Sequence, residues 1–595
     1  MLTFFRRTGG GLPHLESPLS FCRIHWNDEP ASNPLTPSLS PFEGERVPDL
    51  SAVGLAKAEG RERGSFMESP HDFFVAHWDH EPDWTISCRI CNTKLSERFV
   101  RFLGRVIKYR TLSLAAALLV LAGAISAFAA QNFYVTPSGA DTSPGTAAQP
   151  LREIRAALEL VAPGDSILVA DGTYLGFDVD SRTGTASAPI TVRSVGTNAV
   201  VVKTTDRGDN RDTIHIIDSA FVIIDGLRSF DANRAALRVE GGTHITVRNC
   251  VLGNNATWGL FTDFSDDLLI ENNECYASAA QHGIYVSNSG DRPTLRGNRC
   301  HDNFGSGIQL NADVNIQPGD GIITGALIEN NVLYNNGAGG GGAVNLDGVQ
   351  DSVIRNNLLF NNHASGIILF QIDGAEGPRG NQVYHNTIDM AADGRWDLNF
   401  LQTTGTNVAR NNILLTRHSF RGGLRFGDAN DVANTDSDYN VVTRITPDDN
   451  AILTLAEWQA QGRELHSITG TLTNLFVDTT VGNYHLLTNA SAVDVAQPLP
   501  TVTADLEGNL RPSGGAPDMG CYELSPFALK ISAFNGGQPL LRMSGGAGRT
   551  YRLDSSSALT NWVVATTLIQ SNRPLEYLEA NPLPGRRFYR ASFAP

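Results

Sequence analysis

Apolar and polar positions repeat along the chain between about residues 214 and 440. Each unit contains a short apolar stretch with a polar bend inside it, as in VRNCVL at 247, IENNEC at 270 and IRNNLL at 354. A second apolar stretch follows in each unit, and Gly or Ala precedes its first large residue. These large residues are Leu260, Ile284, Ile308, Val344 and Ile367. Two short strands, a bend and a variable loop per unit predict one coil of a β-solenoid, whose stacked coils bury a continuous apolar column.

The bend of each unit carries a residue of the same kind in the same place. The column reads Cys250, Asn273, Asn298, Asn331, Asn357, Asn386 and Asn412, at spacings of 23, 25, 33, 26, 29 and 26 residues. Asn tolerates a left-handed backbone, and its amide can hydrogen-bond to the Asn of the coil above and of the coil below. We therefore interpret these asparagines as structural. Cys275 and Cys300 share another column, in which a packed thiol pair and a disulfide are both possible.

The segments that flank the repeats have patterns of their own. Four apolar residues between 151 and 158 have helical spacing, which predicts a helix that seals the open end of the solenoid. Residues 527–595 alternate apolar and polar positions between turn residues, which predicts a small β-sandwich-like module. Anchoring, sorting, carbohydrate contact and simple packing would each suit that module. The predicted solenoid spans residues 131–525.

An uncharged apolar stretch, TLSLAAALLVLAGAISAFAA, occupies residues 111–130. Basic residues precede it and Ala-Phe-Ala stands near its end, which predicts a signal peptide at 106–130 and a secreted or cell-surface protein. A single transmembrane segment over 111–130 is the alternative, because about 20 apolar residues can span a bilayer. Residues 1–105 lack sustained periodicity, so we interpret them as a disordered or non-native extension upstream of the true start.

Composition and charge exclude several classes of protein. The 595 residues are 41% hydrophobic and 18% charged, which is typical of a folded chain with at least two globular units. A formal charge of −16 argues against a nucleic-acid partner, because such proteins need a basic footprint. The single Cys-x-x-Cys motif, Cys88 and Cys91, has no second half with which to complete a zinc site. Between residues 131 and 525 the only lysine is Lys203.

Alternation within the second strand of each coil predicts which side chains face outward. The outward residues are Phe261, Asp263, Tyr285, Ser287, Gln309, Asn311, Asn345, Asp347, Ile368 and Phe370. They form a polar and aromatic stripe that crosses the coils. Such a stripe suits a polysaccharide, because the ligand is itself a periodic rod that needs hydrogen bonds and an aromatic platform at intervals. We predict that Gln309, Asn311, Asn345 and Asp347 bind the substrate.

The coils, together with the opening FYVTPSGADTSPGTAAQPLREIRAALELVAPGDSILVADGTY (133–174) and with TGTASAPITVRS (183–194), support a family assignment. Residues 131–525 resemble the right-handed parallel β-helix proteins of the pectate-lyase type. The closing DLEGNLRPSGGAPDMGCYE (505–523) resembles the final segment of many secreted bacterial β-helix proteins. The resemblance implies an all-β fold, namely a right-handed parallel β-helix followed by the small C-terminal module. It also implies a substrate groove along one face of the coils.

The resemblance points to a polysaccharide lyase-like, carbohydrate-active protein, with a noncatalytic glycan-binding or structural solenoid as the alternative. Elimination at a uronic acid needs a base, a proton donor and a group that neutralises the carboxylate. His282 as base, Tyr285 as acid and Arg292 as neutraliser form one workable catalytic set, in which Gln309 or Asn345 could replace Arg292. The plain alternative is that His282 and Tyr285 are surface packing.

The loop from Ala312 to Gly325 is the longest insertion between coils, and it offers a possible metal site. Asp313, Asp320 and Asp347 could bind Ca²⁺, which prefers several carboxylate or carbonyl oxygens. Ordinary turn chemistry without any cofactor is the alternative. The predicted partner is a polysaccharide, an acidic one if the protein is a lyase, and we expect a monomer. Motifs of polygalacturonase-type hydrolases, lysine-base pectate lyases and Asp-Pro-His epimerases are incomplete or absent in the sequence, so the reaction stays open at this point.

Overall fold

The computed structural model describes most of the chain from residue 130 onward. The described ranges are 130–202, 211–448, 451–524, 528–535, 538–544, 550–557, 559, 561–569, 575–579 and 587–593. The predicted extension (1–105), nearly all of the apolar segment (106–130) and Lys203 lie outside these ranges. Within them, no helix is long and apolar enough to cross a membrane.

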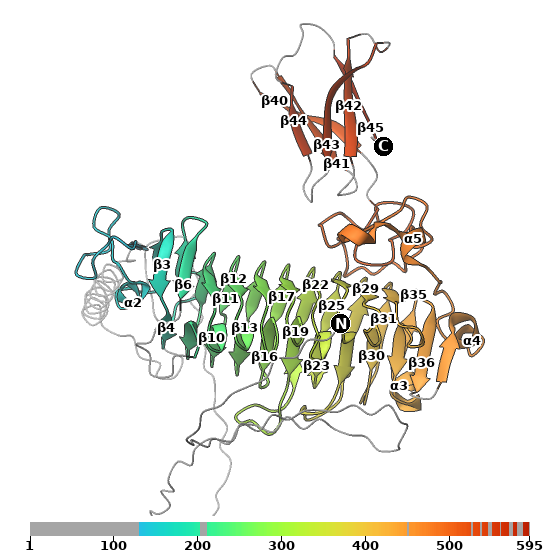
Figure 1. Cartoon of the computed structure of the whole chain (residues 1–595), viewed down its shortest axis with the longest axis horizontal. Coiled ribbons are helices and arrows are strands. Elements are labelled where there is room, and N and C mark those ends of the chain that lie inside the picture. Colours follow the sequence, from blue (N-terminus) through green and yellow to red (C-terminus); the bar gives the residue numbers. More distant parts are fainter. Residues whose placement is uncertain are drawn as a thin grey trace, which may run out of the picture. The chain divides into compact units, whose positions relative to one another are not determined.

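Residues 132–448 wind into coils whose strands stack as three parallel sheets (Figure 1). Sheet 1 has twelve strands, namely β1 (Asn132–Val135), β2 (Ser166–Val169), β5 (Ile190–Ser194), β8 (Val222–Asp225), β11 (Thr246–Arg248), β14 (Leu269–Glu271), β17 (Thr294–Arg296), β21 (Leu327–Glu329), β25 (Val353–Arg355), β28 (Gln382–Tyr384), β31 (Asn407–Arg410) and β34 (Thr435–Asp438). Sheet 2 has eleven strands, namely β3 (Gly172–Leu175), β6 (Ala199–Val202), β9 (Arg228–Phe230), β12 (Val251–Gly253), β15 (Glu274–Tyr276), β18 (Arg299–His301), β22 (Val332–Tyr334), β26 (Leu358–Phe360), β29 (Thr387–Met390), β32 (Ile413–Thr416) and β35 (Val441–Val442).

Sheet 3 holds the second strand of each predicted unit. Its twelve strands are β4 (Phe177–Asp180), β7 (Ile214–Ile217), β10 (Ala235–Glu240), β13 (Trp258–Asp263), β16 (Ile284–Ser287), β19 (Ile308–Asn311), β23 (Gly342–Asp347), β27 (Ser365–Phe370), β30 (Leu398–Phe400), β33 (Leu424–Phe426), β36 (Arg444–Asp448) and β37 (Ala451–Thr454). All neighbours pair in parallel except β36 and β37, which are antiparallel. The predicted parallel β-helix is therefore confirmed.

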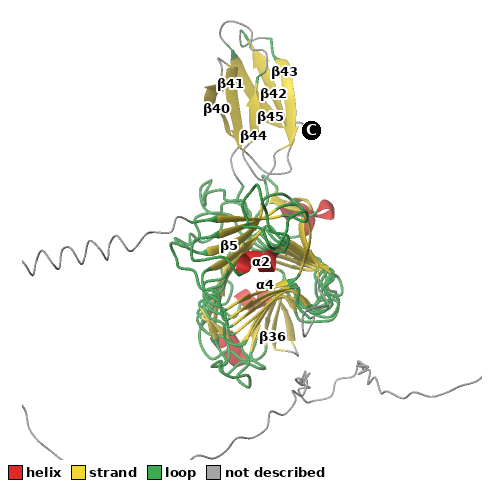
Figure 2. Cartoon of the chain, turned by 90° about the vertical axis from the view of Figure 1, so that its left-hand side faces the viewer, coloured by secondary structure: helices red, strands yellow, loops and turns green. Residues whose placement is uncertain are grey.

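The core lies between the three sheets. Leu260, Ile284, Ile308, Val344 and Ile367 are aligned in adjacent strands of sheet 3 and are fully buried, as the repeat predicts. Helix α2 (Ile154–Leu158) buries three apolar side chains against the first coils, which confirms the predicted sealing helix. Helix α4 (Leu455–Gln459) adds Leu455 and Trp458 to the same core. Viewed along the coils, α2 and α4 lie within the outline of the solenoid (Figure 2).

The asparagine column forms a continuous hydrogen-bonded ladder between sheets 1 and 2. The side-chain oxygen of Asn331 accepts from the backbone and the side chain of Asn298 at 2.9 and 3.1 Å. The amide nitrogen of Asn331 donates to Leu295 O at 2.9 Å and to Asn357 Oδ1 at 3.0 Å. The predicted structural role is confirmed, with one difference. The left-handed backbone occurs at the residue before the ladder position, as at Asn330 (φ 57°).

Replacing Asn331 by Ala is expected to lower the free energy of unfolding by about 2–3 kcal/mol, because buried backbone and amide groups of the adjacent coils lose their partners. Urea unfolding monitored by circular dichroism measures this change. Asn315→Ala, in an exposed loop, is the matched control and should stay within about 0.5 kcal/mol of wild type. An equally small effect at Asn331 would show that the ladder does not contribute to stability.

Cys275 and Cys300 are register partners in sheet 2, and both are buried free thiols. The hydrogen bond between them and their burial hold the pKa of Cys275 well above its usual value. Of the two alternatives for this pair, the structure therefore shows packed thiols.

Asp397 occupies a position in sheet 3 where the neighbouring coils have a small residue. It aligns with Gly366 on one side and with Gly423 on the other, and its carboxylate is fully buried without a hydrogen-bond partner among the described residues. Burial, with a smaller contribution from Asp389, raises the pKa of Asp397 well above its usual value. In the folded protein this carboxyl therefore keeps its proton at a pH where the unfolded chain has lost it.

Asp397→Ala is expected to stabilise the protein at neutral pH by about 1–3 kcal/mol, because the buried carboxyl favours unfolding once the unfolded chain can ionise it. This penalty in wild type grows as pH rises from about 4, the carboxyl pKa of the unfolded chain, to the raised folded pKa. The gain should therefore vanish below about pH 4. Unfolding free energies of both proteins across this pH range check the sign. Asp393→Ala, a largely exposed carboxylate, is the control, and a pH-independent difference at Asp397 would contradict the argument.

After β37 the chain leaves the coils. Helix α4 adds to the core, and residues 468–524 pack on the outside of sheet 2. This segment contains α5 (Leu472–Leu475), β38 (Phe476–Asp478), the 3-10 helix η1 (Thr479–Val481) and β39 (Asn483–Leu486). Its apolar side chains cover the outward Leu358, Ile413 and Val441 of sheet 2. The predicted solenoid range of 131–525 thus includes a final portion that does not form coils.

Residues 528–593 contain two three-stranded antiparallel sheets. One consists of β40 (Ala528–Asn535), β41 (Gln538–Ser544) and β44 (Leu575–Leu578), and the other of β42 (Thr550–Ser556), β43 (Val563–Ile569) and β45 (Phe588–Phe593). Both contribute to one small core around Leu541, Met543, Tyr551 and Leu553. This arrangement is consistent with the predicted β-sandwich-like module.

Candidate active site

The outer face of sheet 3 has the register that the alternation predicted. Its first column reads Arg238, Phe261, Tyr285, Gln309, Asn345, Ile368, Asn399 and Arg425. Its second column reads Glu240, Asp263, Ser287, Asn311, Asp347 and Phe370. Successive residues of a column lie about 4.8 Å apart, the spacing of neighbouring strands. The two columns therefore place polar and aromatic groups side by side along the coils.

Loops wall this face on both sides. On the side of sheet 1, the segments after β19 and after β27 bond to each other, through Val314 N to Asp373 O at 3.0 Å and Ala375 N to Gly321 O at 2.8 Å. The short strands β20 (Ile323–Thr324) and β24 (Val349–Gln350) pair beside them. Gln309, Asn311 and Asn345 are consequently only 7–8% exposed. The face is a recessed surface rather than an open plane.

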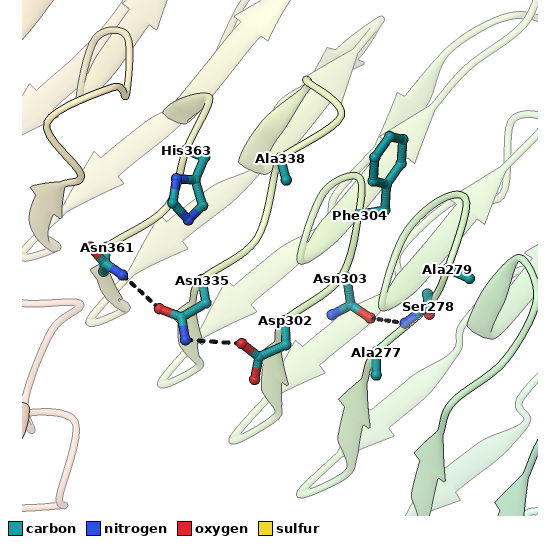
Figure 3. A pocket seen from close by; sticks show the side chains of 10 residues that line it. All are labelled: Ala277, Ser278, Ala279, Asp302, Asn303, Phe304, Asn335, Ala338, Asn361 and His363. Carbon is teal, nitrogen blue, oxygen red and sulfur yellow. Dashed lines mark hydrogen bonds between the residues drawn. The ribbon is translucent and has the colours of Figure 1, made fainter. Parts of the chain in front are cut away.

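On the other side, the turns between sheets 2 and 3 enclose a shallow pocket of about 540 Å³ (Figure 3). A chain of amides forms part of its lining, since Asn361 donates to Asn335 at 2.8 Å and Asn335 donates to Asp302 at 2.9 Å. Phe304 and His363 project from two of the turns, and Phe304 is 48% exposed. Apart from Asp302 and His363, the residues that line this pocket have no ionisable side chain.

His282 lies in such a turn, two residues before β16 begins at Ile284. Its Nδ1 accepts the backbone N–H of Ser306 at 2.9 Å, and its ring meets the Tyr285 ring edge-on at 5.2 Å. Burial lowers the pKa of His282 to about 3, so the imidazole is neutral and its proton is on Nε2. With Nδ1 already accepting a hydrogen bond, no basic lone pair remains for the predicted role of general base. His282 instead positions Tyr285 and offers an N–H.

Tyr285 is half-buried in the centre of the face. Burial, followed by the nearby Asp373, Asp313 and Asp347, raises the pKa of Tyr285, while the Asn311 amide beside it opposes the shift. The phenol therefore stays protonated, which is the state that the predicted role as an acid requires. Phe261 stacks on Tyr285 with ring centroids 5.4 Å apart.

Trp258 extends the aromatic platform, and the sequence analysis missed it. Its ring lies 4.4 Å from that of Phe261 and 5.9 Å from that of Tyr285. Trp258 begins β13, just before the glycine that precedes the inward Leu260. A large aromatic residue two positions before an inward residue of the repeat was the sequence feature that could have identified it.

Asp373 is a second site residue that alternation could not find, because it belongs to the loop after β27. The amide nitrogen of Asn311 donates to Asp373 Oδ2 at 3.4 Å. Burial raises the pKa of Asp373, with a smaller contribution from Asp313. A carboxylate of raised pKa thus lies beside the protonated phenol of Tyr285, which is a suitable pairing for proton transfer.

The three predicted calcium ligands are engaged separately. Asp347 accepts backbone N–H groups of Ile372, Asp373 and Gly374 at 2.8, 2.9 and 3.2 Å, and so holds the loop after β27 in place. Burial raises the pKa of Asp347 to about 6. Asp313 accepts the N–H of Asn315, and Asp320 that of Ile322. In the described part of the chain no three His, Cys, Asp or Glu side chains are grouped as a metal site requires, so the predicted set does not fit a calcium ion.

Arg292 does not lie free beside Tyr285. It occupies the turn before β17, where its Nε lies 2.7 Å from Asp267 and its terminal nitrogens lie within 3.6 Å of Asp266 and Asp291. These three carboxylates already neutralise the guanidinium, so it does not fit the predicted role toward a substrate carboxylate.

Amides occupy the position next to Tyr285 instead. Asn345 Nδ2 donates to Gln309 Oε1 at 2.5 Å, and Ser306 Oγ donates to the same oxygen at 3.2 Å. This leaves the Gln309 amide nitrogen to donate toward a ligand. Gln309 and Asn345 thus lie together where the sequence predicted substrate contacts.

A group of arginines marks the far end of the face. We call Arg395, Arg421 and Arg425, with the indole of Trp396 among them, the arginine cluster. The guanidinium carbons of Arg425 and Arg421 lie 4.1 and 5.1 Å from the Trp396 ring centroid, and Trp396 Nε1 donates to Thr446 at 3.2 Å. The sequence pattern does not predict this cluster, because two of its arginines come from loops of different coils.

Comparison with known proteins gives the class. Residues 133–407 match a family model described as Pel9A-like, right handed beta helix region. This match covers the coils from β1 into β31. The matched region, just under half of the chain, consists of coils that the structure shows as stacked parallel sheets, so the fold agrees with the right-handed β-helix that the family model describes.

Individual relatives are more distant. The chain is 33% identical over 85 residues to pectate lyase PEL9 of Emericella nidulans, a stretch that is 14% of this chain and 21% of that protein. The match thus spans about a fifth of the length of this curated relative. The crystal structure of pectate lyase Pel9A aligns with a TM-score of 0.46 and 17% identity, over 66% of this chain and 96% of that one. An alginate lyase from a Paenibacillus species aligns with a TM-score of 0.36 and 22% identity, over 48% and 96% of the two chains.

Proposed function

We propose that this protein is an exported, monomeric enzyme that acts on an acidic polysaccharide by elimination, as a polysaccharide lyase does. The observation that carries the proposal is the outer face of sheet 3. There the amide of Asn311 bonds to Asp373 and lies beside Tyr285, which brings a carboxylate and a phenol together in the centre, and the arginine cluster lies on the same face. The family match over 133–407 and the relative named as a pectate lyase support the same class of substrate. Export follows from the predicted signal peptide.

Each step of an elimination has a candidate group on this face. Asp373 removes the proton from the carbon next to the substrate carboxylate, and the Gln309 amide stabilises the charge that develops there. The bond to the leaving glycosidic oxygen breaks as that oxygen takes the proton of Tyr285. Asp373 then returns its proton to Tyr285. The products are one new reducing end and one unsaturated sugar, and the enzyme is restored.

The test is incubation of the exported chain with pectate, alginate, glycosaminoglycans and neutral glycans, each with and without calcium. Ultraviolet absorbance reports unsaturated products, and a reducing-end assay runs in parallel. We expect both signals to rise with at least one acidic polysaccharide. New reducing ends without absorbance would indicate a hydrolase. Binding without either signal would support the noncatalytic glycan-binding solenoid and overturn the proposal.

A further inference from the structure

The arginine cluster differs in charge balance from the rest of the face. At the opposite end, Arg238 lies 2.7 Å from Asp263 and 3.1 Å from Glu240, so its charge is matched. No carboxylate of the described residues lies within ion-pair distance of Arg395 or Arg421. In a chain of formal charge −16, two half-buried cations without acidic partners are an unusual arrangement.

The cations of the cluster also oppose one another. Burial lowers the pKa of Arg395, and Arg425 adds to the effect. Burial, Arg395 and Arg425 likewise lower the pKa of Arg421. Placing like charges together costs free energy, and an anion held between them would remove that cost.

The geometry of the cluster suits a carboxylate. Trp396 lies against the guanidinium groups of both Arg421 and Arg425, and such stacking orients these planar groups. Guanidinium edges bind carboxylates with two parallel hydrogen bonds. On the strand between Ile368 and Arg425, Asn399 is fully buried, and neither atom of its amide has a hydrogen-bond partner among the described residues. The floor of the cluster thus offers an unused donor and acceptor.

The distance along the face determines how long a ligand must be to contact both Tyr285 and the arginine cluster. From Tyr285 the register passes Gln309, Asn345, Ile368 and Asn399 before it reaches Arg425. Five steps of about 4.8 Å make about 24 Å, which only a chain of several sugar units can span. A dimer or trimer bound at Tyr285 would not reach the cluster.

We infer that Arg395 and Arg421, beside Trp396, form a distal subsite that binds carboxylates of an acidic polysaccharide, several sugar units away from Tyr285. The inference rests on the proposed function and deepens it, because it makes the protein selective for long polyuronate chains. Short uronates and neutral glycans gain nothing from this subsite.

The parent protein in this test is Tyr285→Phe, which leaves the ligand uncleaved. It is compared with the same protein carrying Arg395→Gln and Arg421→Gln, which we call the double variant. Calorimetry measures binding of long and of dimeric or trimeric oligouronates. We expect the double variant to bind long chains about 10- to 100-fold more weakly, the loss typical of charge-assisted hydrogen bonds, and to bind short chains as the parent does. Arg421→Lys, which keeps the charge without the planar fork, should lose less than Arg421→Gln.

Arg296→Gln, a half-exposed arginine on sheet 1, is the matched control for a lost positive charge. Thermal unfolding verifies that every variant is folded. Equal affinity of parent and double variant for long chains would overturn the subsite, even if wild type releases unsaturated products. Loss of long-chain binding in the double variant would support it, even if wild type releases none and the proposed elimination fails. Absence of uronate binding at any length would overturn both.

Discussion

Tyr285→Phe is expected to lower kcat on an acidic polysaccharide by about 10²- to 10⁴-fold, the usual contribution of a positioned general acid. The substitution removes the phenolic O–H and keeps the ring that stacks on Phe261. KM should change little, because the aromatic platform and the amides of Gln309 and Asn345 remain. Initial rates of unsaturated-product formation measure the effect.

Tyr334→Phe is the matched control, since it removes an outward phenolic O–H from sheet 2 instead of sheet 3. It should retain wild-type kcat.

The pH profile gives a second readout, because the raised pKa of Asp373 requires activity to rise as this carboxyl ionises. The raised pKa of Tyr285 requires the phenol to stay protonated on the alkaline side of that rise. A Tyr285→Phe protein with wild-type kcat would remove this residue from the mechanism.

Glu523→Gln is expected to destabilise the segment that covers sheet 2 by about 3–5 kcal/mol, because it leaves the buried charge of Arg511 without its counter-ion. Arg511 and Glu523 have side-chain exposures of 0% and 1%, and their charged atoms lie 2.8 Å apart. Arg511 also donates to the carbonyl groups of Asp518 and Gly520 at 2.9 and 2.7 Å. The pair thus joins the two ends of the GNLRPSGGAPDMGCYE stretch (508–523) by an ion pair.

Denaturant unfolding and proteolysis of residues 455–524 measure this loss. Asp141→Asn is the control, because its partner Arg152 is 56% exposed and surface pairs contribute at most about 1 kcal/mol. If Glu523→Gln cost no more than Asp141→Asn, the buried pair would not be what holds this segment in place.

Much of the fold could be predicted because each coil repeats the same physical requirement. A strand needs an inward apolar residue and a bend needs a group that bonds to the next coil, so Leu260, Ile284 and the Asn331 column stand out in the sequence. The return of residues 468–524 along sheet 2 could not be predicted in this way. Its contacts with Leu358, Ile413 and Val441 join sequence positions that share no period.

In the candidate site, too, the features that follow from strand geometry could be predicted, and those that depend on neighbouring coils could not. Alternation placed Tyr285, Gln309, Asn311 and Asn345 on one face, since strand geometry alone decides their direction. The predicted roles of His282 and Arg292 do not fit, because they depended on neighbours from other coils. Ser306 occupies the imidazole lone pair of His282, and Asp267 binds Arg292.

The sequence by itself determined the solenoid, its inward columns and the outward stripe, because these follow from a local period of strand and bend that any coil repeats. Only the tertiary structure decided which loops meet over the stripe. Asp347 holds the loop that carries Asp373, and two loops and a strand bring Arg395, Arg421 and Arg425 together around Trp396. Charge and proton affinity depend on distances of a few ångströms across coils. These distances arise only when residues far apart in the chain are stacked, so the chemistry of the site belongs to the fold rather than to a motif.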